Sequence, residues 1–189
     1  MALSREEIAA RYSKALFEYS YDANVLDEVH DELNVLLQVA KANPEIIQLL
    51  SDPILSKDEK RTFLDTFTTG TSDETKEFLK FLVEYQRFSD FIDIIEAFDV
   101  RYNKAKNIAD GIATTAIALQ KEELDKIANA YAKKYGLATL KVKNKVDPSI
   151  LGGVVLQVGD IRIDGSIRTK LQEIREQLLE NKRGETIEH

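Results

Sequence analysis

Histidine is the side chain best suited to acid–base and metal chemistry near neutral pH, and this sequence contains two. His30 stands among four carboxylates, in the run Asp27-Glu-Val-His-Asp-Glu32, on a segment with helical periodicity. No second type of ligand follows at a zinc-binding spacing, so we expect a solvated surface histidine. His189 is the last residue and is expected to be disordered. The sequence has no cysteine, which excludes thiolate zinc ligands, a cysteine nucleophile and disulfide bonds.

A second candidate for chemistry is the glycine-rich segment with Gly152-Gly153 and Gly159. It contains neither G-x-x-x-x-G-K-[ST] nor G-x-G-x-x-G, so we interpret its glycines as turn residues rather than a phosphate-binding loop. No Ser-His-Asp or lysine-based nucleophile arrangement is indicated. Most carboxylates fall opposite apolar helix stripes, where solvation explains them. We therefore predict no catalytic residue, no cofactor and no metal site.

Composition indicates a packed protein in two parts. The 189 residues are 43% hydrophobic and 31% charged, which is typical of a folded chain. Residues 1–105 hold 12 Lys and Arg against 21 Asp and Glu, a net charge of −9, whereas residues 106–189 hold 14 against 12, a net charge of +2. Such an acidic first part disfavours nucleic-acid binding. The first residues lack the features of a signal or transit peptide, and no apolar run approaches the ~20 residues of a membrane span, so we expect membrane association only through a partner.

The first part, residues 1–105, is predicted to form six helices joined by short connections, a six-helix bundle. Ser4–Glu7 and Ser56–Glu59 fit capping boxes. Asn43-Pro44 is expected to start a short third helix, Thr71–Glu74 to cap the fifth, and Ser89 to cap the sixth. The remaining helices follow from apolar residues at helical spacing.

The second part, residues 106–189, is predicted to be a smaller α+β domain, so that the whole fold is mainly α. We expect a strand at Gly111–Ala118, a helix at Lys121–Tyr135 that Gly136 ends, and a half-buried strand at 138–146. Gly159-Asp160 is predicted to be a two-residue hairpin turn. A last helix carries Ile167, Leu171, Ile174 and Leu178 on one stripe and gives way to a polar tail after about Asn181. This pattern does not match a βαβ dinucleotide-binding fold.

Two regions, the first and fifth helices together and one later strand, carry side chains that packing in a single core does not explain. The predicted fifth helix, Glu77–Tyr85, is apolar around most of its circumference, so it is either central to its own bundle or shows one face to the core and another to a partner helix. The first helix places Tyr12 and Tyr19 near the small residues Ala9 and Ala15. Further along, Lys141, Lys143 and Lys145 lie on the outward face of one strand. They either form a solvated row that discourages edge pairing or contact an acidic partner.

Three sequence segments resemble one family. The segment Ala10-Arg-Tyr-Ser-Lys-Ala-Leu-Phe17 resembles the opening motif of the delta subunit of F-type ATP synthase, called the oligomycin-sensitivity-conferring protein in mitochondria. Val146-Asp-Pro-Ser-Ile-Leu-Gly-Gly-Val154 and Gly159-Asp-Ile-Arg-Ile-Asp-Gly-Ser166 resemble its C-terminal signature. Their order and spacing and the chain length agree, so the resemblance covers nearly the whole chain. Ser13 replaces the usual alanine of the opening motif.

The resemblance implies a non-catalytic stator subunit of a rotary proton-translocating enzyme. The N-terminal domain is expected to bind the N-terminal helix of alpha subunits in a groove of the first and fifth helices. The C-terminal domain is expected to bind the ends of the b subunits of the peripheral stalk. The alpha-binding residues would be Tyr12, Ala15, Tyr19, Phe78, Phe81, Leu82 and Tyr85, and the b-binding residues Lys141, Lys143 and Lys145. Phe81 is bulkier than the aliphatic residue that is common in the family.

The resemblance also implies one copy per complex and a peripheral position on the cytoplasmic face of a bacterial plasma membrane. Two other hypotheses stay open from the residues. A generic helical adaptor would show no affinity for an alpha N-terminal peptide. An enzyme with a pocket between the two parts would need convergent titratable groups, and the sequence offers none with a recognisable spacing.

Overall fold

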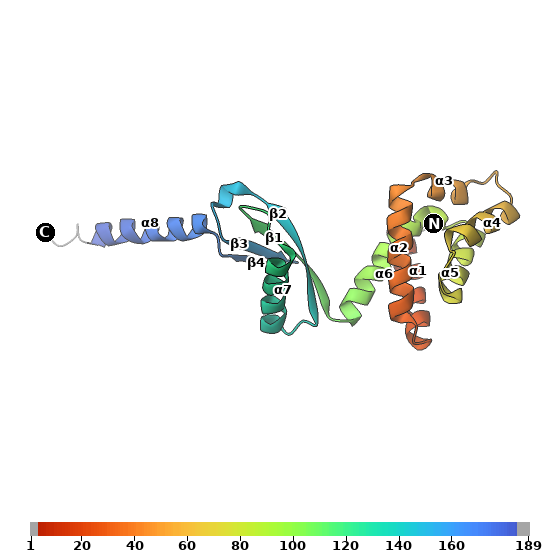
Figure 1. The fold of residues 1–189 in the computed structure, drawn as a ribbon, viewed down its shortest axis with the longest axis horizontal. Coiled ribbons are helices and arrows are strands. Elements are labelled where there is room, and N and C mark those ends of the chain that lie inside the picture. Colours follow the sequence, from red (N-terminus) through yellow and green to blue (C-terminus); the bar gives the residue numbers. More distant parts are fainter. Residues whose placement is uncertain (1–3, 185–189) are drawn as a thin grey trace. The chain divides into compact units, whose positions relative to one another are not determined.

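The computed structural model describes residues 4–184, and their side chains through Leu178. The chain divides into two compact units at the boundary between Ala105 and Lys106. The fold is mainly helical with one small mixed sheet (Figure 1). The prediction of a mainly α fold is confirmed at this level.

The N-terminal unit consists of helices packed around one core. They are α1 (Arg5–Asp22), α2 (Leu26–Ala42), α3 (Glu45–Ser51), α4 (Lys57–Phe67), α5 (Asp73–Glu84), the short 3-10 helix η1 (Phe88–Asp90) and α6 (Phe91–Ala105). Its largest fully buried side chains are aromatic or branched aliphatic, and they include Phe88, Phe91, Phe98, Leu33, Leu79 and Leu82. Close packing of these groups supplies the hydrophobic stabilisation of the unit.

The helix starts in this unit partly follow the sequence signals. Ser4 and Ser56 both form the predicted capping boxes, with Glu7 and Glu59. The predicted cap at Thr71 is wrong by one residue, because Ser72 caps α5 and accepts from the Thr75 amide.

The other two predicted caps are also corrected. Asn43 does not cap α3: Pro44 is the N-cap residue, and it makes no side-chain cap bond. Ser89 does not cap α6, because η1 (Phe88–Asp90) leads directly into that helix.

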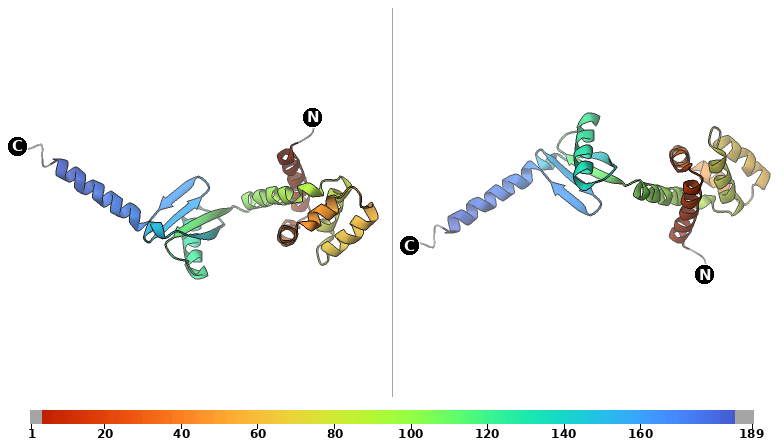
Figure 2. Two further views of the ribbon diagram at one scale, coloured as in Figure 1. Left: turned by 90° about the horizontal axis from the view of Figure 1, so that it is seen from above. Right: turned by 90° about the horizontal axis from the view of Figure 1, so that it is seen from below.

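The C-terminal unit is an α+β arrangement. Its elements are β1 (Ile108–Thr115), α7 (Lys121–Tyr135), β2 (Thr139–Val146), the short 3-10 helix η2 (Pro148–Ile150), β3 (Val154–Val158), β4 (Ile161–Asp164) and α8 (Ile167–Gly184). The strand order is β2-β1-β3-β4, with β1 and β2 parallel and the other pairs antiparallel. Helix α7 lies against one face of the sheet (Figure 2), where Tyr131, Leu140 and Leu156 belong to one small core.

Several sequence predictions for this unit are confirmed. Helix α7 has the predicted bounds, and Gly136 ends it in the left-handed conformation. Gly159 and Asp160 join β3 to β4 as a hairpin turn, with Gly159 at a φ of 55°. The first strand runs from Ile108 to Thr115 rather than from Gly111 to Ala118. The last helix continues to Gly184, past the predicted tail start near Asn181. His189 and the rest of the predicted tail lie outside the described residues.

The segment before β3 requires glycine for a steric reason. Gly153 has a φ of 77°, and a Cβ there would lie 2.3 Å from the backbone oxygen of Gly165. The amide of Gly165 in turn donates to the carbonyl of Val154, and the amide of Ile167 donates to the carbonyl of Gly152. The glycine pair therefore lets two chain segments meet closely, as expected for structural turns.

Candidate functional site

Helix α5 has two different apolar faces. Leu79, Leu82 and Val83 are buried in the core of the N-terminal unit. Phe81 and Tyr85 point outward and remain 42% and 58% exposed. The sequence left two alternatives open, and the structure shows one face of α5 in the core and a second, aromatic face that is partly exposed.

The outward face of α5 meets the first helix through aromatic rings. The ring centroids of Tyr12 on α1 and Phe81 on α5 are 5.8 Å apart, and those of Phe81 and Tyr85 are 4.3 Å apart. Both pairs are tilted, which is a favourable arrangement for aromatic quadrupoles. We call Tyr12, Phe81 and Tyr85 the aromatic cluster. It forms an apolar surface at the junction of α1 and α5.

The other predicted alpha-binding residues fall in different environments. Ala15 and Tyr19 are exposed on α1, and Phe78 is partly buried beside the core. Leu82 is fully buried, so the prediction that it contacts a partner directly is corrected. Its side chain supports α5 from the core side. The sequence alone could not separate Leu82 from Phe81, because the two residues are adjacent on a helix that is apolar on most sides.

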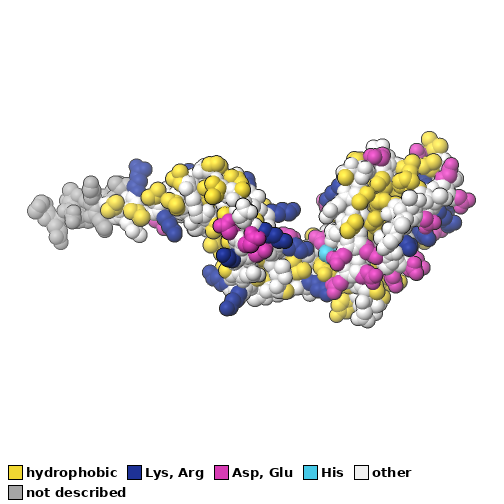
Figure 3. Space-filling model, in the orientation of Figure 1, with side chains coloured by type: hydrophobic (Ala, Val, Ile, Leu, Met, Phe, Trp, Pro, Cys, Tyr) yellow, Lys and Arg dark blue, Asp and Glu magenta, His cyan; other side chains and the backbone are white. Residues whose placement is uncertain are grey.

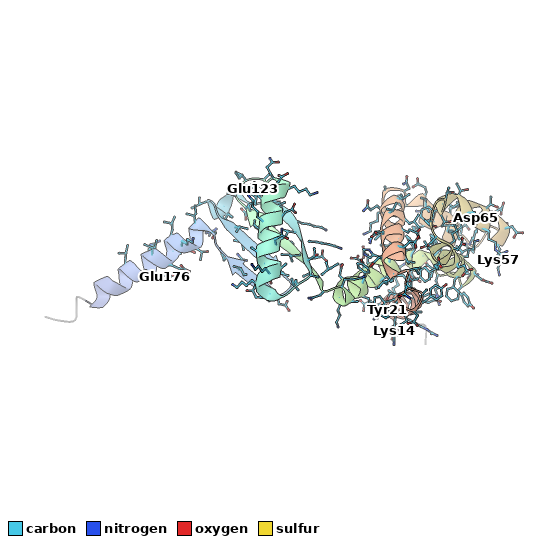
Figure 4. All side chains as sticks on the ribbon, turned by 60° about the horizontal axis from the view of Figure 1, so that its bottom comes forward. Lys14, Tyr21, Lys57, Asp65, Glu123 and Glu176 are labelled. Carbon is cyan, nitrogen blue, oxygen red and sulfur yellow. The ribbon has the colours of Figure 1, made fainter. Side chains whose placement is uncertain are left out.

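Helix α5 is fixed in place by polar contacts at its start. Glu32 on α2 accepts hydrogen bonds from the Ser72 amide at 2.6 Å, the Ser72 hydroxyl at 2.6 Å and the Thr75 hydroxyl at 2.5 Å. An anionic acceptor at a helix N-terminus is also favoured by the helix dipole. Further along α5, Lys80 forms an ion pair with Asp65 on α4 at 3.5 Å (Figure 4 labels Asp65).

Helix α1 is fixed to α6 by a buried serine. The Arg101 guanidinium donates to the hydroxyl of Ser13 at 3.1 Å and to the carbonyl of Ala10 at 3.2 Å. Ser13 is fully buried. An alanine at this position would have no hydroxyl to accept the hydrogen bond from Arg101. Tyr21, labelled in Figure 4, lies further along α1 and stacks on Phe17.

A separate hollow of about 770 Å³ lies between α1 and α6 rather than at the aromatic cluster. Ala9, Ala10 and Ala97 line it together with acidic and basic side chains, among them Arg5 and Asp93. The acidic and basic lining residues are equal in number, so they give no net charge preference for an occupant.

The prediction that His30 is a solvated surface residue is wrong. The side chain is buried between α2 and α6, with Nε2 2.8 Å from Asp99 and Nδ1 3.2 Å from Asp31. Its ring stacks on Tyr102 at a centroid distance of 3.6 Å. Burial, followed by the hydrogen bond that Tyr102 donates to Asp27, raises the pKa of Tyr102 to about 12. This network joins the two helices.

The network around His30 carries no indication of metal chemistry. Among residues 4–184, no group of three or more His, Cys, Asp or Glu side chains is arranged to hold a metal ion. Within the same residues, no helix is long and apolar enough to cross a membrane.

In the C-terminal unit, Lys141, Lys143 and Lys145 are exposed on one face of β2, which is an edge strand. The alternate residues Leu140, Val142 and Asn144 are buried or partly buried. Asn144 donates to Ala113 and to Thr115 on β1. The predicted outward lysine row is therefore present, but Asp110 and Gln157 lie beside Lys141 and Lys143 around a small hollow of about 300 Å³.

A larger exposed apolar feature lies on α8. Ile167, Leu171, Ile174 and Leu178 are between 46% and 61% exposed. Every described side chain of α8 after Thr169 is exposed. In Figure 3 hydrophobic side chains lie beside Lys and Arg side chains on the described part of α8. The sequence predicted the stripe, but it could not show that no other described element covers it.

Comparisons with known proteins cover nearly the whole chain. The sequence matches the family described as "ATP synthase delta (OSCP) subunit" over residues 8–178. It is 62% identical to "ATP synthase subunit delta" of Lactobacillus johnsonii, covering 96% of this chain and 100% of that protein. It is 36% identical to the protein of the same name from Enterococcus hirae, covering 94% of this chain and 99% of that protein.

The fold also has a solved counterpart. A chain of the mitochondrial ATP synthase hexamer of Toxoplasma gondii superposes with a TM-score of 0.65 at 23% identity, covering 90% of this chain and 97% of that chain. This likeness concerns the fold, whereas the family match and the sequence relatives establish the relationship. The chain belongs to the ATP synthase delta (OSCP) subunit family.

Proposed function

We propose that the protein is a stator subunit that holds the catalytic head of a rotary ATP synthase to its peripheral stalk. The N-terminal unit acts as a six-helix bundle that binds the N-terminal helix of an alpha subunit at the aromatic cluster. The observation that carries this proposal is the exposure of Phe81 and Tyr85 on a helix whose opposite face is already buried. Ala15 and Tyr19 extend the same surface along α1.

The aromatic cluster suits a helix ligand on physical grounds. Aromatic side chains bury large areas at low cost in conformational entropy, and they are enriched at the energetic centres of protein interfaces. An amphipathic helix supplies an apolar stripe of matching width. Because Phe81 already contacts Tyr12 and Tyr85, fewer conformations of its ring are lost when a partner binds, which reduces the cost of binding.

The C-terminal unit is proposed to bind the b subunits of the stalk mainly through α8. Its exposed stripe offers more apolar surface than the face of β2 does. The row of Lys141, Lys143 and Lys145 is a second, polar contact in this proposal. The sequence prediction named only these lysines as stalk-binding residues, whereas this proposal makes α8 the main contact.

A stator must resist torque, so its contacts need slow dissociation. Two separate contacts on one chain supply this, because each holds the other partner at a high effective concentration. The proposed role requires no active site and no cofactor. It places one copy in each complex, peripheral to the membrane on the cytoplasmic face.

The alpha contact can be tested by titrating the full chain with a peptide of the alpha N-terminus in a calorimeter. Phe81→Asp and Tyr12→Asp should each weaken binding by about tenfold or more, as expected for central interface residues. Val35→Asp is a matched control, because Val35 is an exposed apolar residue on α2. Unchanged affinity of both cluster variants would remove this assignment.

The connector role can be tested by interrupting the chain after Ala105, at the boundary of the two units. In reconstituted vesicles, a chain split there should leave ATP hydrolysis active but lower proton pumping. An insertion of three residues at the same place is the control, since it keeps the covalent link. If the split protein supported full pumping, the connector role would be excluded.

A further inference from the structure

The charges beside the exposed stripe of α8 form a one-sided pattern. At about 100° per residue, Ile167, Leu171, Ile174 and Leu178 form one narrow stripe with the four-three-four spacing of a coiled-coil seam. In heptad terms Ile167 and Ile174 occupy d positions, and Leu171 and Leu178 occupy a positions. The stripe therefore has two d–a pairs, the residue pattern of a helix–helix seam, within the described part of α8.

The flanking e and g positions of this seam are basic or neutral. They hold Arg168, Lys170, Arg175 and Gln177, all of them exposed. The acidic residues Glu173 and Glu176 fall at c and f positions, away from the seam (Figure 4 labels Glu176). Within the described residues, no ion pair is formed by Lys170 or Arg175.

Flanking charges set partner choice in coiled coils, because residues at e and g face those of the other helix. A second copy of α8 would place cations against cations in either orientation. A helix with Glu or Asp at its flanks would pair with Arg168, Lys170 and Arg175. The pattern therefore disfavours self-association, because the two copies would repel each other, and it favours an acidic helix, which the cations attract.

We propose that α8 recognises one partner helix that carries apolar a and d residues and acidic e and g residues, and that its basic flanks reject a second copy of this chain. The inference rests on the proposed stalk-binding function, since it describes the chemistry of that same contact. It adds the selecting residues, Arg168, Lys170 and Arg175, which neither the apolar stripe nor the lysine row on β2 identifies.

The test uses the full chain and three synthetic helical peptides of four heptads. All have Leu at a and d, and they carry Glu, Gln or Lys at every e and g position. Anisotropy titration at low salt should give the tightest binding for the Glu peptide, about tenfold tighter than the Gln peptide. Three exposed charge pairs, each contributing about two- to threefold, account for this difference. Added salt should reduce it.

A charge-reversed chain, Arg168→Glu with Lys170→Glu and Arg175→Glu, should instead prefer the Lys peptide. These side chains are exposed, so the reversal should leave the fold intact. Circular dichroism checks this, because the charge of Arg168 also helps to lower the pKa of Asp147. Equal affinity for the three peptides, or no binding of any of them, would overturn the proposal. So would a wild-type chain that dimerises through α8 in sedimentation.

The stalk assignment is measured separately with the b subunit itself. If the wild-type chain discriminates among the peptides but does not bind b, the proposed function fails and the charge preference stands. If b binds the wild-type and charge-reversed chains equally, the charge preference fails and the stalk contact stands.

Discussion

The two units place their apolar residues in different ways. The N-terminal unit encloses Phe88, Phe91 and Phe98 in one extensive core and leaves a small aromatic surface between α1 and α5. The C-terminal unit has a smaller core, centred on Tyr131, Leu140 and Leu156, and exposes the whole stripe of α8. In this chain, one exposed apolar surface therefore lies on a well-packed group of helices, whereas the other lies along a single helix whose apolar side is exposed.

The largest effect is expected from emptying the N-terminal core. Phe98 is buried among the helices and lies next to Phe17 and His30. Phe98→Ala should destabilise the N-terminal unit by about 3–5 kcal/mol, because it removes buried area and leaves a cavity. Hydrogen exchange resolved by peptide should show faster exchange in α1, α2 and α6 and unchanged exchange in the sheet. Equal acceleration in both units would contradict the separation of their cores.

A smaller loss, of about 3 kcal/mol, is expected from Gly153→Ala in the other unit. The added Cβ would meet the backbone oxygen of Gly165 at 2.3 Å, and the φ of 77° is itself unfavourable for alanine. Gly159→Ala is the control, because Gly159 also has a positive φ but has open space around it. It should cost only about 1 kcal/mol. Denaturant melts that show equal losses for the two variants would exclude the close approach as the cause.

Acid should destabilise the C-terminal unit at the two aspartates that flank the glycine-rich segment. Hydrogen bonds from Ser149 lower the pKa of Asp147, and hydrogen bonds from Ser166 lower the pKa of Asp164. Since the folded-state pKa is below the unfolded value, the stabilisation is present above about pH 4 and is lost as the pH falls through the folded pKa.

We therefore expect the melting temperature of the C-terminal unit to fall below about pH 4. In Asp164→Asn that part of the pH dependence should be reduced. A capping carboxylate also exists in the N-terminal unit, where hydrogen bonds with Ser56 lower the pKa of Glu59. Glu59→Gln is thus the matched variant, and it should leave the acid response of the C-terminal unit unchanged. If Glu59→Gln reduced the acid response of the C-terminal unit and Asp164→Asn did not, Asp164 would not be its source.

The smallest stability effect is expected on α8. Leu171 is 54% exposed, so Leu171→Ala should change the free energy of unfolding by less than about 0.5 kcal/mol. Leu79→Ala on α5 is the comparison, because Leu79 is fully buried, and it should cost about 2–5 kcal/mol. A large loss from Leu171→Ala in the isolated chain would mean that the stripe is already covered.

Local signals predicted much of this fold. The serine–glutamate boxes, the end of α7 at Gly136 and the hairpin at Gly159 depend on neighbouring residues, and the structure has them as predicted. At the start of α5, Ser72 also donates to Glu32, which is 40 positions away in the sequence. A pattern of nearby residues could not contain that contact.

Long-range packing also explains the other corrections. His30 is buried because Asp99 and Tyr102 on α6 lie against it, although its sequence neighbours are acidic and polar. The parallel pairing of β1 with β2 across α7 was likewise absent from the sequence prediction. For the surfaces, the sequence identified the apolar residues of α5 and α8, but only the packing separated buried Leu82 from exposed Phe81.

The central claim is that each unit binds its own partner. The most direct test measures the binding of each variant to both partners. Wild type, Phe81→Asp and the double variant Leu171→Asp with Ile174→Asp would each be titrated with the alpha N-terminal peptide and with the b subunit. We predict that Phe81→Asp loses affinity only for the alpha peptide, and that the double variant loses affinity only for b. If either variant lost both partners, or if neither lost any, the division of binding between the two units would be contradicted.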